Sequence, residues 1–308
     1  MLQCGRERCH HPLNYRPARV SDLEPATALI IEAIDALERQ HGFEGLVADG
    51  DFSNPFAAFS LEDDPSGLWV AEENGVLQVY GFSWTSGPLW FLAGLFVRPG
   101  RQTSGIGRAL FERTMKQADE HNGLIRALIT FAYNRVSLGL YMRFGLFPLV
   151  PLFELTGPIP KATSPLAVAT IDAEGKDTAL LEELDQSVLG LSRAKHHHYS
   201  AQRSDLNGYI LKTAENTPVG YLYISAAGRI GPVAVTSTKL MPQALATGFA
   251  TAAKLDCPAV SVIVPGACGS ALSLALSSGL RIRRLMVLLA SRTFGDWARY
   301  APRDPGFM

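Results

Sequence analysis

Apolar and polar positions along the chain predict strands and helices that follow one another. In the first half, apolar runs predict strands at residues 15–20, 68–72, 79–85, 89–97, 124–131 and 147–155. Apolar residues at helical spacing predict helices beginning at residue 21, at 105–121 and at 136–144. Ser21 with Glu24 three residues later has the form of a capping box. The antiparallel start, followed by alternation of strands and helices, predicts a mixed α/β sheet.

The same order of predicted elements recurs after a proline-bearing stretch at residues 158–165. Gly81 corresponds to Gly220 and Gly145 to Gly279, at offsets of 139 and 134 residues. We therefore expect a degenerate tandem duplication with domains at 1–157 and 158–308. Each would be a mixed, mostly antiparallel sheet flanked by helices. The alternative is that the two halves share only a common α/β rhythm.

The bulk composition narrows the class of protein. The chain has 308 residues, 47% of them hydrophobic and 19% charged, and a formal net charge of -1. This favours a soluble globular protein without a nucleic-acid partner, because no global basic field is present. No apolar run reaches the ~18–20 residues of a membrane span, so we expect no membrane partner. The basic run at 281–284 is interpreted as a strand edge or solvated face. Composition leaves the oligomeric state open.

Cysteine and histidine usage bears on compartment and metal binding. Residues 1–11 contain no apolar leader segment, which favours a reducing cytoplasmic location with free thiols at the four cysteines, Cys4, Cys9, Cys257 and Cys268. Cys4 and Cys9 with the adjacent histidines could hold a metal, but an N-terminal tail is the favoured interpretation. The run of histidines at 196–198 is interpreted as a loop or capping segment, since adjacent residues cannot all face one centre in a strand. No metal is expected.

The most informative stretch for function runs from Gln102 to Arg108. It follows the predicted strand at 89–97 and opens a predicted helix. Such a strand–loop–helix junction makes an anion cradle, because the first N–H groups of a helix lack partners and the helix dipole favours negative charge. Gly105 and Gly107 would let the backbone approach a ligand closely. The alternative is a helix N-terminus with tight packing. Gly107 is followed by neither Lys nor Ser/Thr and position 110 is Leu110, so Walker and dinucleotide loops are excluded.

Two motifs together resemble a known superfamily. Gln102-x-x-Gly105-x-Gly107 is similar to the acyl-CoA loop of the GCN5-related N-acetyltransferase (GNAT) superfamily. About 30 residues later, Asn134, Tyr141 and the segment at 144–147 resemble its Asn…Tyr…Gly-Phe element. The resemblance runs from about Tyr15 to Val150. It implies two tandem GNAT-like domains, of which the first carries the cofactor loop.

The resemblance implies roles for particular residues. The residues implied to bind the cosubstrate, acetyl-CoA or another acyl-CoA, are Phe96, Val97, Gln102, Thr103, Ser104, Gly105, Ile106, Gly107, Arg108 and Asn134. Tyr141 would be catalytic and protonate the leaving thiolate, the alternative being a core aromatic on an amphipathic helix. The partner would be a small-molecule amine that attacks the thioester directly. No general base is identified, because the strand at 89–97 has no ionisable side chain before the loop.

The second half lacks this chemistry in the sequence. If Val97 corresponds to Val233, then Gln102, Gly105 and Gly107 fall on Thr238, Met241 and Gln243. Matching Gly145 to Gly279 places Asn134 on Cys268 and Tyr141 on Ala275. The expected function is therefore an acyl-CoA-dependent N-acyltransferase with one cofactor site, the acyl group being acetyl. The rival interpretation is a non-catalytic acyl-CoA-binding or regulatory protein, and a third is other acyl-CoA chemistry such as decarboxylation.

Overall fold

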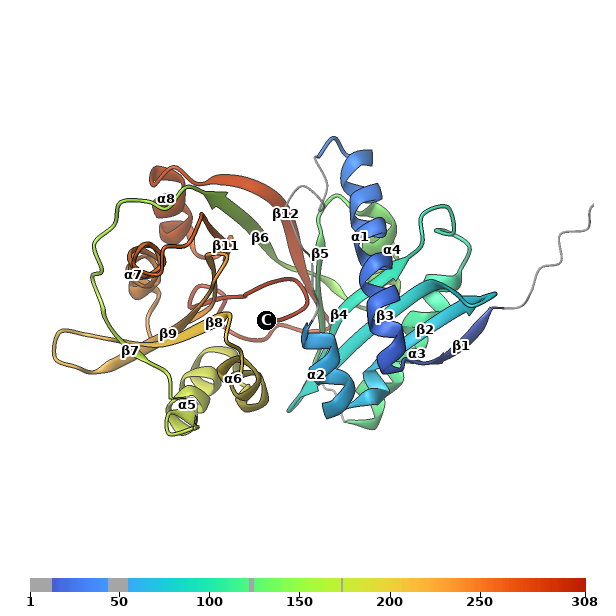
Figure 1. The fold of residues 1–308 in the computed structure, drawn as a ribbon, viewed down its shortest axis with the longest axis horizontal. Coiled ribbons are helices and arrows are strands. Elements are labelled where there is room, and N and C mark those ends of the chain that lie inside the picture. The colour runs from blue at the N-terminus through green and yellow to red at the C-terminus, as the bar shows by residue number, and fades with distance from the viewer. Residues whose placement is uncertain (1–12, 44–54, 122–124, 173) are drawn as a thin grey trace, which may run out of the picture. The chain divides into compact units, whose positions relative to one another are not determined.

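The computed structural model describes residues 13–43, 55–121, 125–172 and 174–308 (Figure 1). The chain divides into two compact units, Met1–Trp84 with Gly94–Gln117, and Thr85–Ala93 with Ala118–Met308. The helices are α1 (Leu23–Gln40), α2 (Pro55–Asp63), α3 (Ile106–Glu120), α4 (Arg135–Arg143), α5 (Thr178–Leu189), α6 (Ala194–Ala201), α7 (Met241–Lys254) and α8 (Gly269–Ser277). The strands are β1 (Asn14–Pro17), β2 (Leu68–Glu73), β3 (Val76–Ser86), β4 (Leu89–Val97), β5 (Ile125–Phe131), β6 (Phe147–Gly157), β7 (Ala167–Thr170), β8 (Leu206–Lys212), β9 (Pro218–Ser225), β10 (Arg229–Val235), β11 (Val260–Pro265), β12 (Arg281–Ala290) and β13 (Tyr300–Ala301).

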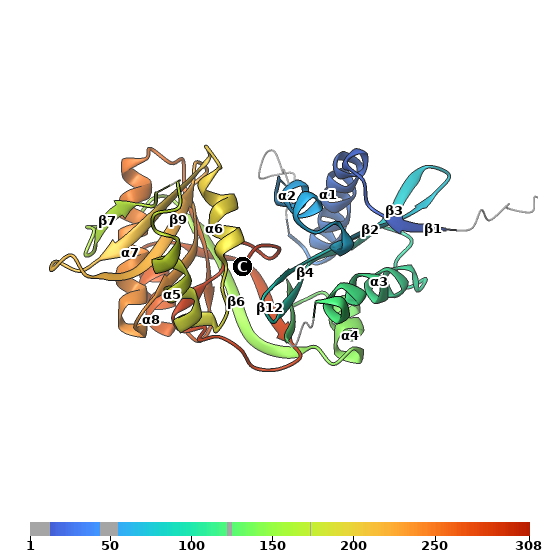
Figure 2. The same ribbon diagram turned by 90° about the horizontal axis from the view of Figure 1, so that it is seen from below.

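The first unit is built on an antiparallel sheet. Strand β1 pairs with β2, and β2 pairs with β3. Helices α1 and α2 lie on one face of this sheet and α3 on the other (Figure 2). Helix α1 buries Leu29, Ile30 and Ala33 at the spacing that one helical face requires. The helical pattern in the sequence therefore corresponds to a real packing face.

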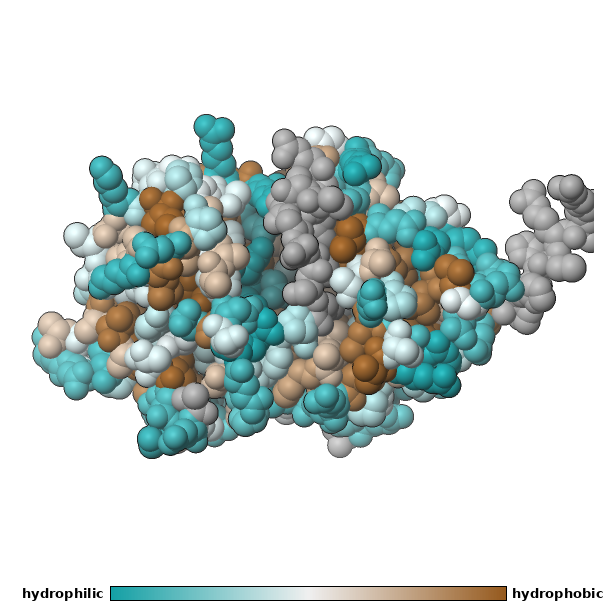
Figure 3. All heavy atoms as spheres, viewed as in Figure 1, coloured by the Kyte–Doolittle hydropathy of each residue, from teal (hydrophilic) through white to brown (hydrophobic). Residues whose placement is uncertain are grey.

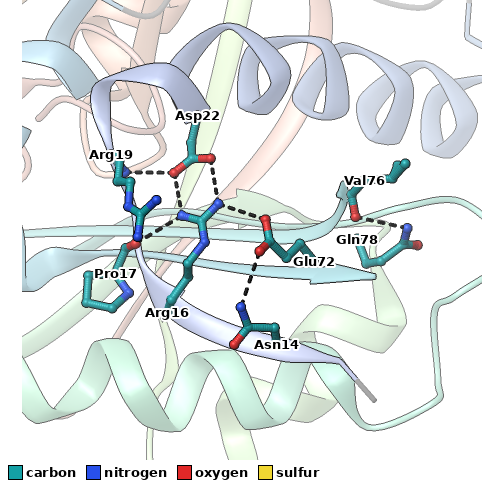
Figure 4. A network of polar contacts seen from close by, with 8 residues as sticks. All are labelled: Asn14, Arg16, Pro17, Arg19, Asp22, Glu72, Val76 and Gln78. Carbon is teal, nitrogen blue, oxygen red and sulfur yellow. Dashed lines mark hydrogen bonds and ion pairs between the residues drawn. The ribbon is translucent and has the colours of Figure 1, made fainter. Parts of the chain in front are cut away.

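An ion network fixes the entry to α1 in place of the predicted capping box. The Arg16 guanidinium donates to both carboxylate oxygens of Asp22, at 2.7 and 2.9 Å, and to Glu72 on β2 at 2.7 Å (Figure 4). Asp22 also accepts from the backbone N–H of Arg19 at 2.7 Å, which starts a 3₁₀ turn over Val20–Asp22. The prediction of Ser21 as helix cap is wrong, because Ser21 lies inside that turn and Asp22 is the N-cap residue of α1. The Asp22 carboxylate bonds to Arg16 and Arg19 and makes no side-chain cap to the helix.

The second unit contains a long mixed sheet. Its strand order is β5-β12-β6-β11-β10-β9-β8-β7, with the beginning of β4 beside β5 and the short β13 beside β10. Helices α5 and α6 pack on one face and α7 and α8 on the other (Figure 2). The core under α7 is formed by buried side chains including Leu245 and Phe249, packed on Ile230 and Val262.

The two halves of the sequence exchange their last strands within this sheet. Strand β12 lies between β5 and β6, so Leu288 is level with Ile129 on one side and Val150 on the other. Strand β6 in turn pairs with β11, where Leu155 faces Val262. All three pairings are antiparallel, and each half of the sequence supplies a strand to the other half's ladder. Residues 281–284 pair only with β6, because the ladder of β12 with β5 begins at Met286. Arg281 and Ile282 are exposed, in line with the predicted strand edge or solvated face, whereas Arg284 is buried.

The tandem duplication is confirmed by the order of elements. From β1 to β6 the order of strands and α-helices is the same as from β7 to β12. Gly145 and Gly279 have φ values of 77° and 92°, and both end a helix. Behind them, Leu146 N–H donates to Tyr141 O and Leu280 N–H to Ala275 O, each at 3.1 Å. The correspondence of Tyr141 with Ala275 is therefore also a structural one, while a boundary near residue 158 stays a prediction.

Two further sequence interpretations concern the run of histidines and the N-terminal cysteines. The interpretation of the histidines at 196–198 as a loop or capping segment is wrong, because all three lie within helix α6, and the first two are buried. Cys4, Cys9 and the histidines beside them lie outside the described residues. Within the described part of the chain, no helix combines the length and apolarity needed to cross a bilayer. The face in Figure 3 mixes polar and apolar residues.

Candidate active site

The predicted phosphate loop is an exposed turn that leads into α3 in the first unit. Residues 102–105 are exposed, and among the described residues the backbone N–H groups of 102–107 have no acceptor. Thr103 and Gly105 have φ values of 64° and 84°. Left-handed residues between right-handed ones turn successive N–H groups toward one concavity, which is an anion-binding arrangement. Thr103 is a non-glycine residue in a region that costs conformational energy, as is typical of functional loops.

Hydrogen bonds within the loop hold its shape. The Ser104 hydroxyl donates to Arg101 O and the Thr103 hydroxyl to Gln102 O, both at 2.6 Å. The Arg101 guanidinium donates to Glu73 at 2.8 Å, which ties the start of the loop to the end of β2. Arg108, in the first turn of α3, donates to Glu112 at 2.9 Å. The loop is thus preformed, and its polar side chains engage carbonyls and carboxylates and leave the N–H groups exposed.

The two glycines of the motif serve different purposes. A Cβ on Gly105 would meet no heavy atom within 4 Å, so its positive φ explains the glycine and any side chain would project into open space. A Cβ on Gly107 would lie 2.9 Å from Val97 Cγ2. Gly107 therefore allows α3 to pack closely on β4. The ligand-facing role expected of both glycines from the sequence stays a prediction.

Strand β4 changes its neighbours midway along its length. Its parallel ladder with β5 ends at Leu92 and Leu128, although β4 continues to Val97. The first four residues of β4 are buried, and the remaining five are only half-buried. Val97 packs on the cluster that contains Ile106 and Leu110 at the start of α3. The predicted roles of the N–H groups near Phe96 and Val97 remain predictions.

Asn134 and Tyr141 lie on one helix of the second unit. Asn134 is the N-cap of α4, and its side-chain oxygen accepts from Ser137 N–H at 3.1 Å. Tyr141, two turns along, is 4% exposed, and burial raises its pKa well above the usual value, an effect that a hydrogen bond with Ser137 partly opposes. The phenol therefore stays protonated at neutral pH. The loop belongs to one unit and Asn134 and Tyr141 to the other.

The corresponding loop of the second half is closed. A 3₁₀ turn over Thr238–Leu240 takes the place of the open loop, with Leu240 N–H donating to Ser237 O at 3.0 Å. Met241 is 2% exposed, and Pro242, which has no N–H, stands in the first turn of α7. As expected from the sequence, Met241 places a bulky side chain here and Pro242 removes a backbone N–H donor.

The strand next to this second loop is also occupied by the chain itself. The parallel ladder of β10 with β11 covers only Arg229 and Ile230. Beyond it, β10 pairs with β13, with Val233 level with Ala301. The N–H of Val235 also donates to Arg299 O at 3.0 Å. The part of β10 beyond its ladder with β11 corresponds to the end of β4. It pairs with β13, whereas the end of β4 does not pair with β5.

Comparison with known proteins agrees with these features. The sequence model described as the acetyltransferase (GNAT) family matches residues 32–146, which include the loop, Asn134 and Tyr141. Residues 32–146 therefore resemble a GNAT-family domain. No curated protein sequence matches the chain.

Solved structures extend the likeness to the whole chain. A candidate acetyltransferase from Pyrococcus horikoshii superposes with a TM-score of 0.75 at 17% identity, covering 100% of both chains. A GCN5-related N-acetyltransferase from Sphaerobacter thermophilus gives 0.61 at 16%, covering 93% of this chain and 98% of its own. A tandem GNAT protein of the clavulanic acid biosynthesis pathway gives 0.57 at 15%, covering 92% and 99%. At such identities the likeness concerns the fold, which is that of two tandem GNAT-like domains.

Proposed function

We propose that the chain is an acyl-CoA-dependent N-acyltransferase that moves an acetyl group from acetyl-CoA to the amine of a small molecule. The observation that carries this is the open turn at 102–107, whose N–H groups have no acceptor among the described residues. The turn belongs to a GNAT-like domain, and the GNAT family uses acyl-CoA. N–H groups directed at one concavity beside a helix N-terminus suit a pyrophosphate. Gln102, Thr103, Ser104, Gly105, Ile106, Gly107 and Arg108 would form this site.

Asn134 and Tyr141 would act on the thioester end of the cosubstrate. The Asn134 oxygen caps α4, so its amide nitrogen is the group that would donate to the pantetheine arm. Tyr141 would donate its proton to the thiolate that leaves when the amine attacks the carbonyl carbon. Its raised pKa means that the phenol is protonated at neutral pH before this step. The N–H groups near Phe96 and Val97 would polarise the thioester carbonyl, since the strand is half-buried there.

One cofactor site in the chain follows from the closed second half. The 3₁₀ turn at Thr238–Leu240 and the β13 strand beside Val233 would both have to be displaced before a second acyl-CoA could bind. The second half would then act as a scaffold for the first. We also propose a cytoplasmic location, because the free cysteines Cys257 and Cys268 suit a reducing compartment.

The test is an amine-panel assay that detects the free CoA thiol, combined with calorimetric titration of CoA. Turnover of at least one amine supports the transferase. Tight CoA binding with no turnover of any amine would establish the rival function, a non-catalytic acyl-CoA-binding or regulatory protein. The absence of an ionisable side chain in Leu89–Val97 keeps that rival in the test. Absence of CoA binding would overturn both functions.

A further inference from the structure

An arginine in the second unit is fully enclosed. Arg193 is the N-cap residue of α6 and is 0% exposed. Its guanidinium carbon lies 5.5 Å from the ring centre of Tyr300 and 5.6 Å from that of Phe307. A guanidinium cannot lose its charge in a protein, so this cation has been taken out of water permanently. A buried charge of this kind requires hydrogen-bond acceptors.

The hydrogen bonds of Arg193 leave one edge of the guanidinium unused. Nη1 donates to the Tyr221 hydroxyl at 3.2 Å. Nε and Nη2 have no acceptor among the described residues, although both atoms are buried. These two nitrogens form one side of the planar fork, and their N–H bonds are parallel. That spacing matches the two oxygens of a carboxylate.

The nearby carboxylate of Asp185 does not occupy this edge. One Asp185 oxygen accepts from the Tyr221 hydroxyl at 2.5 Å and the other from His197 Nε2 at 2.8 Å. His197 Nδ1 accepts from the Tyr223 hydroxyl at 2.8 Å. Asp185 is thus held by the network behind Arg193, and Tyr221 links the two charges without giving Arg193 a direct ion pair.

This network lies against elements of the GNAT-like domain that belong to the same unit. The Ser86 hydroxyl at the end of β3 donates to the carbonyl of Ser192, next to Arg193, at 2.6 Å. Gly306, next to Phe307, approaches the carbonyl of Ala93 so closely that a Cβ there would lie 3.1 Å from the oxygen. Ala93 follows directly after the residue at which the β4–β5 ladder ends. Arg193 therefore stands near the point where β4 leaves β5.

We propose that the Nε–Nη2 edge of Arg193 binds the carboxylate of a small molecule. We further infer that this molecule is the acceptor, an amine that also carries a carboxylate, such as an amino acid or a close derivative. The second inference rests on the proposed transferase function, whereas the first does not. The second half of the chain would then contribute a specificity residue in place of its lost cofactor loop. A separate small acid bound at the same edge is the other source of the carboxylate.

Binding is tested on the full chain without acyl-CoA. Formate, acetate and a set of amino acids are titrated by calorimetry into the wild type and into Arg193→Lys, which keeps the charge and removes the fork. Arg299→Lys is the matched control, because each nitrogen of the Arg299 guanidinium already donates within the protein, to Asp296, Thr236 and Ser187. We expect a carboxylate whose Kd rises about tenfold or more in Arg193→Lys and stays unchanged in the control. Binding of no carboxylate, or equal binding by Arg193→Lys, overturns the site.

Turnover distinguishes the two sources of the carboxylate. Each amino acid is compared with its amide and its decarboxylated amine at saturating acetyl-CoA. A preference for the amino acids that disappears in Arg193→Lys through a higher KM supports the inference that the bound carboxylate belongs to the acceptor. If carboxylates bind but the amides are turned over as fast as the amino acids, the carboxylate at Arg193 does not belong to the acceptor. The site then binds a separate small acid. Carboxylate binding with no turnover of any amine refutes the transferase but leaves the Arg193 site standing. Should Arg193→Lys not fold, the wild-type melting temperature decides: it must rise with the carboxylate and not with its amide.

Discussion

The carboxylate of Glu154 lies 3.0 Å from the guanidinium of Arg284, although the two residues come from opposite halves of the sequence. Its other oxygen accepts from Arg229, also at 3.0 Å. Glu154 is 4% exposed on β6, and Arg284 lies beside it on β12. The exchanged strands are therefore joined by a buried ion network as well as by their backbone ladder.

Replacing Glu154 should destabilise the second unit markedly. Glu154→Gln leaves the Arg284 cation buried without its partner, and breaking such a pair costs about 3–5 kcal/mol. The free energy of unfolding from urea titration measures the loss. Glu174→Gln is the control, because Glu174 pairs with Lys176 on an exposed surface and should change the value by less than about 1 kcal/mol. Equal losses of unfolding free energy in the two variants would contradict a stabilising role of the Glu154 ion network.

The same residue predicts a pH dependence. Burial raises the pKa of Glu154, but the charges and hydrogen bonds of Arg229 and Arg284 outweigh it and hold the pKa below its usual value. The unfolded state thus binds a proton more readily than the folded one, so this contribution is present above the ordinary pKa of 4.5 and is lost as pH falls below it. The stability difference between wild type and Glu154→Gln should shrink below about pH 4.5. A difference that grows on acidification would refute this sign.

A single charge in the phosphate loop should weaken acyl-CoA binding. Gln102→Glu keeps the size of the side chain and places a negative charge beside the N–H groups that would hold the pyrophosphate. We expect Kd for CoA to rise roughly tenfold in calorimetry, with unchanged circular dichroism. Gln243→Glu makes the same change at an exposed position in the first turn of α7 and should leave Kd unchanged. Unaltered affinity in Gln102→Glu would remove the loop from the cofactor site.

Tyr141→Phe should affect the chemical step. The change retains the buried ring and deletes the proton donor, so kcat should fall ~10²–10⁴-fold with little change in the KM for acyl-CoA. Because burial raises the pKa of Tyr141, wild-type kcat should show no loss from this group up to the ordinary tyrosine value of about 10. Tyr209→Phe, a half-buried tyrosine on β8, is the matched control. Full activity of Tyr141→Phe would leave Tyr141 a packing residue.

The intact chain should bind one acyl-CoA. The second loop is closed by its 3₁₀ turn, and β13 covers Val233, so a calorimetric stoichiometry near one is expected. Two equivalent sites per chain would contradict this. A chain ending at Gly157 should in addition lose its fold, because β5 and β6 would both lose β12 as their neighbour. Its solubility and circular dichroism provide the measurement.

Local sequence signals predicted the elements well where one mechanism dominates. Strand β4 spans Leu89–Val97 as predicted, and helix α3 spans Ile106–Glu120, within one residue of the predicted range at each end. Gly145 and Gly279 were matched from sequence alone because both end a helix in the left-handed region. The prediction of a cap at Ser21 is wrong because Arg16 on β1 pairs with Asp22, and no local sequence pattern indicates that contact.

Long-range features could not be predicted from the sequence. Apolar alternation in β12 is the same whether its neighbour is β5, β6 or water, so the strand exchange leaves no local mark. Helix α6 has three histidines and a weakly apolar face, and it was missed. Arg193 beside it was one of many basic residues in the sequence. Its burial, and the donors that already occupy both oxygens of Asp185, are what lead to its proposed role.

The exchanged strands have a further consequence for how the protein depends on its own concentration. Two separate chains that traded their last strands in this way would form a swapped dimer, and their stability would fall on dilution. Here residues 158–166 join β6 to β7, so the partner strand is always attached at a high effective concentration. The strand exchange should therefore persist at any dilution, and the proline-bearing linker replaces the association step that a dimer would require.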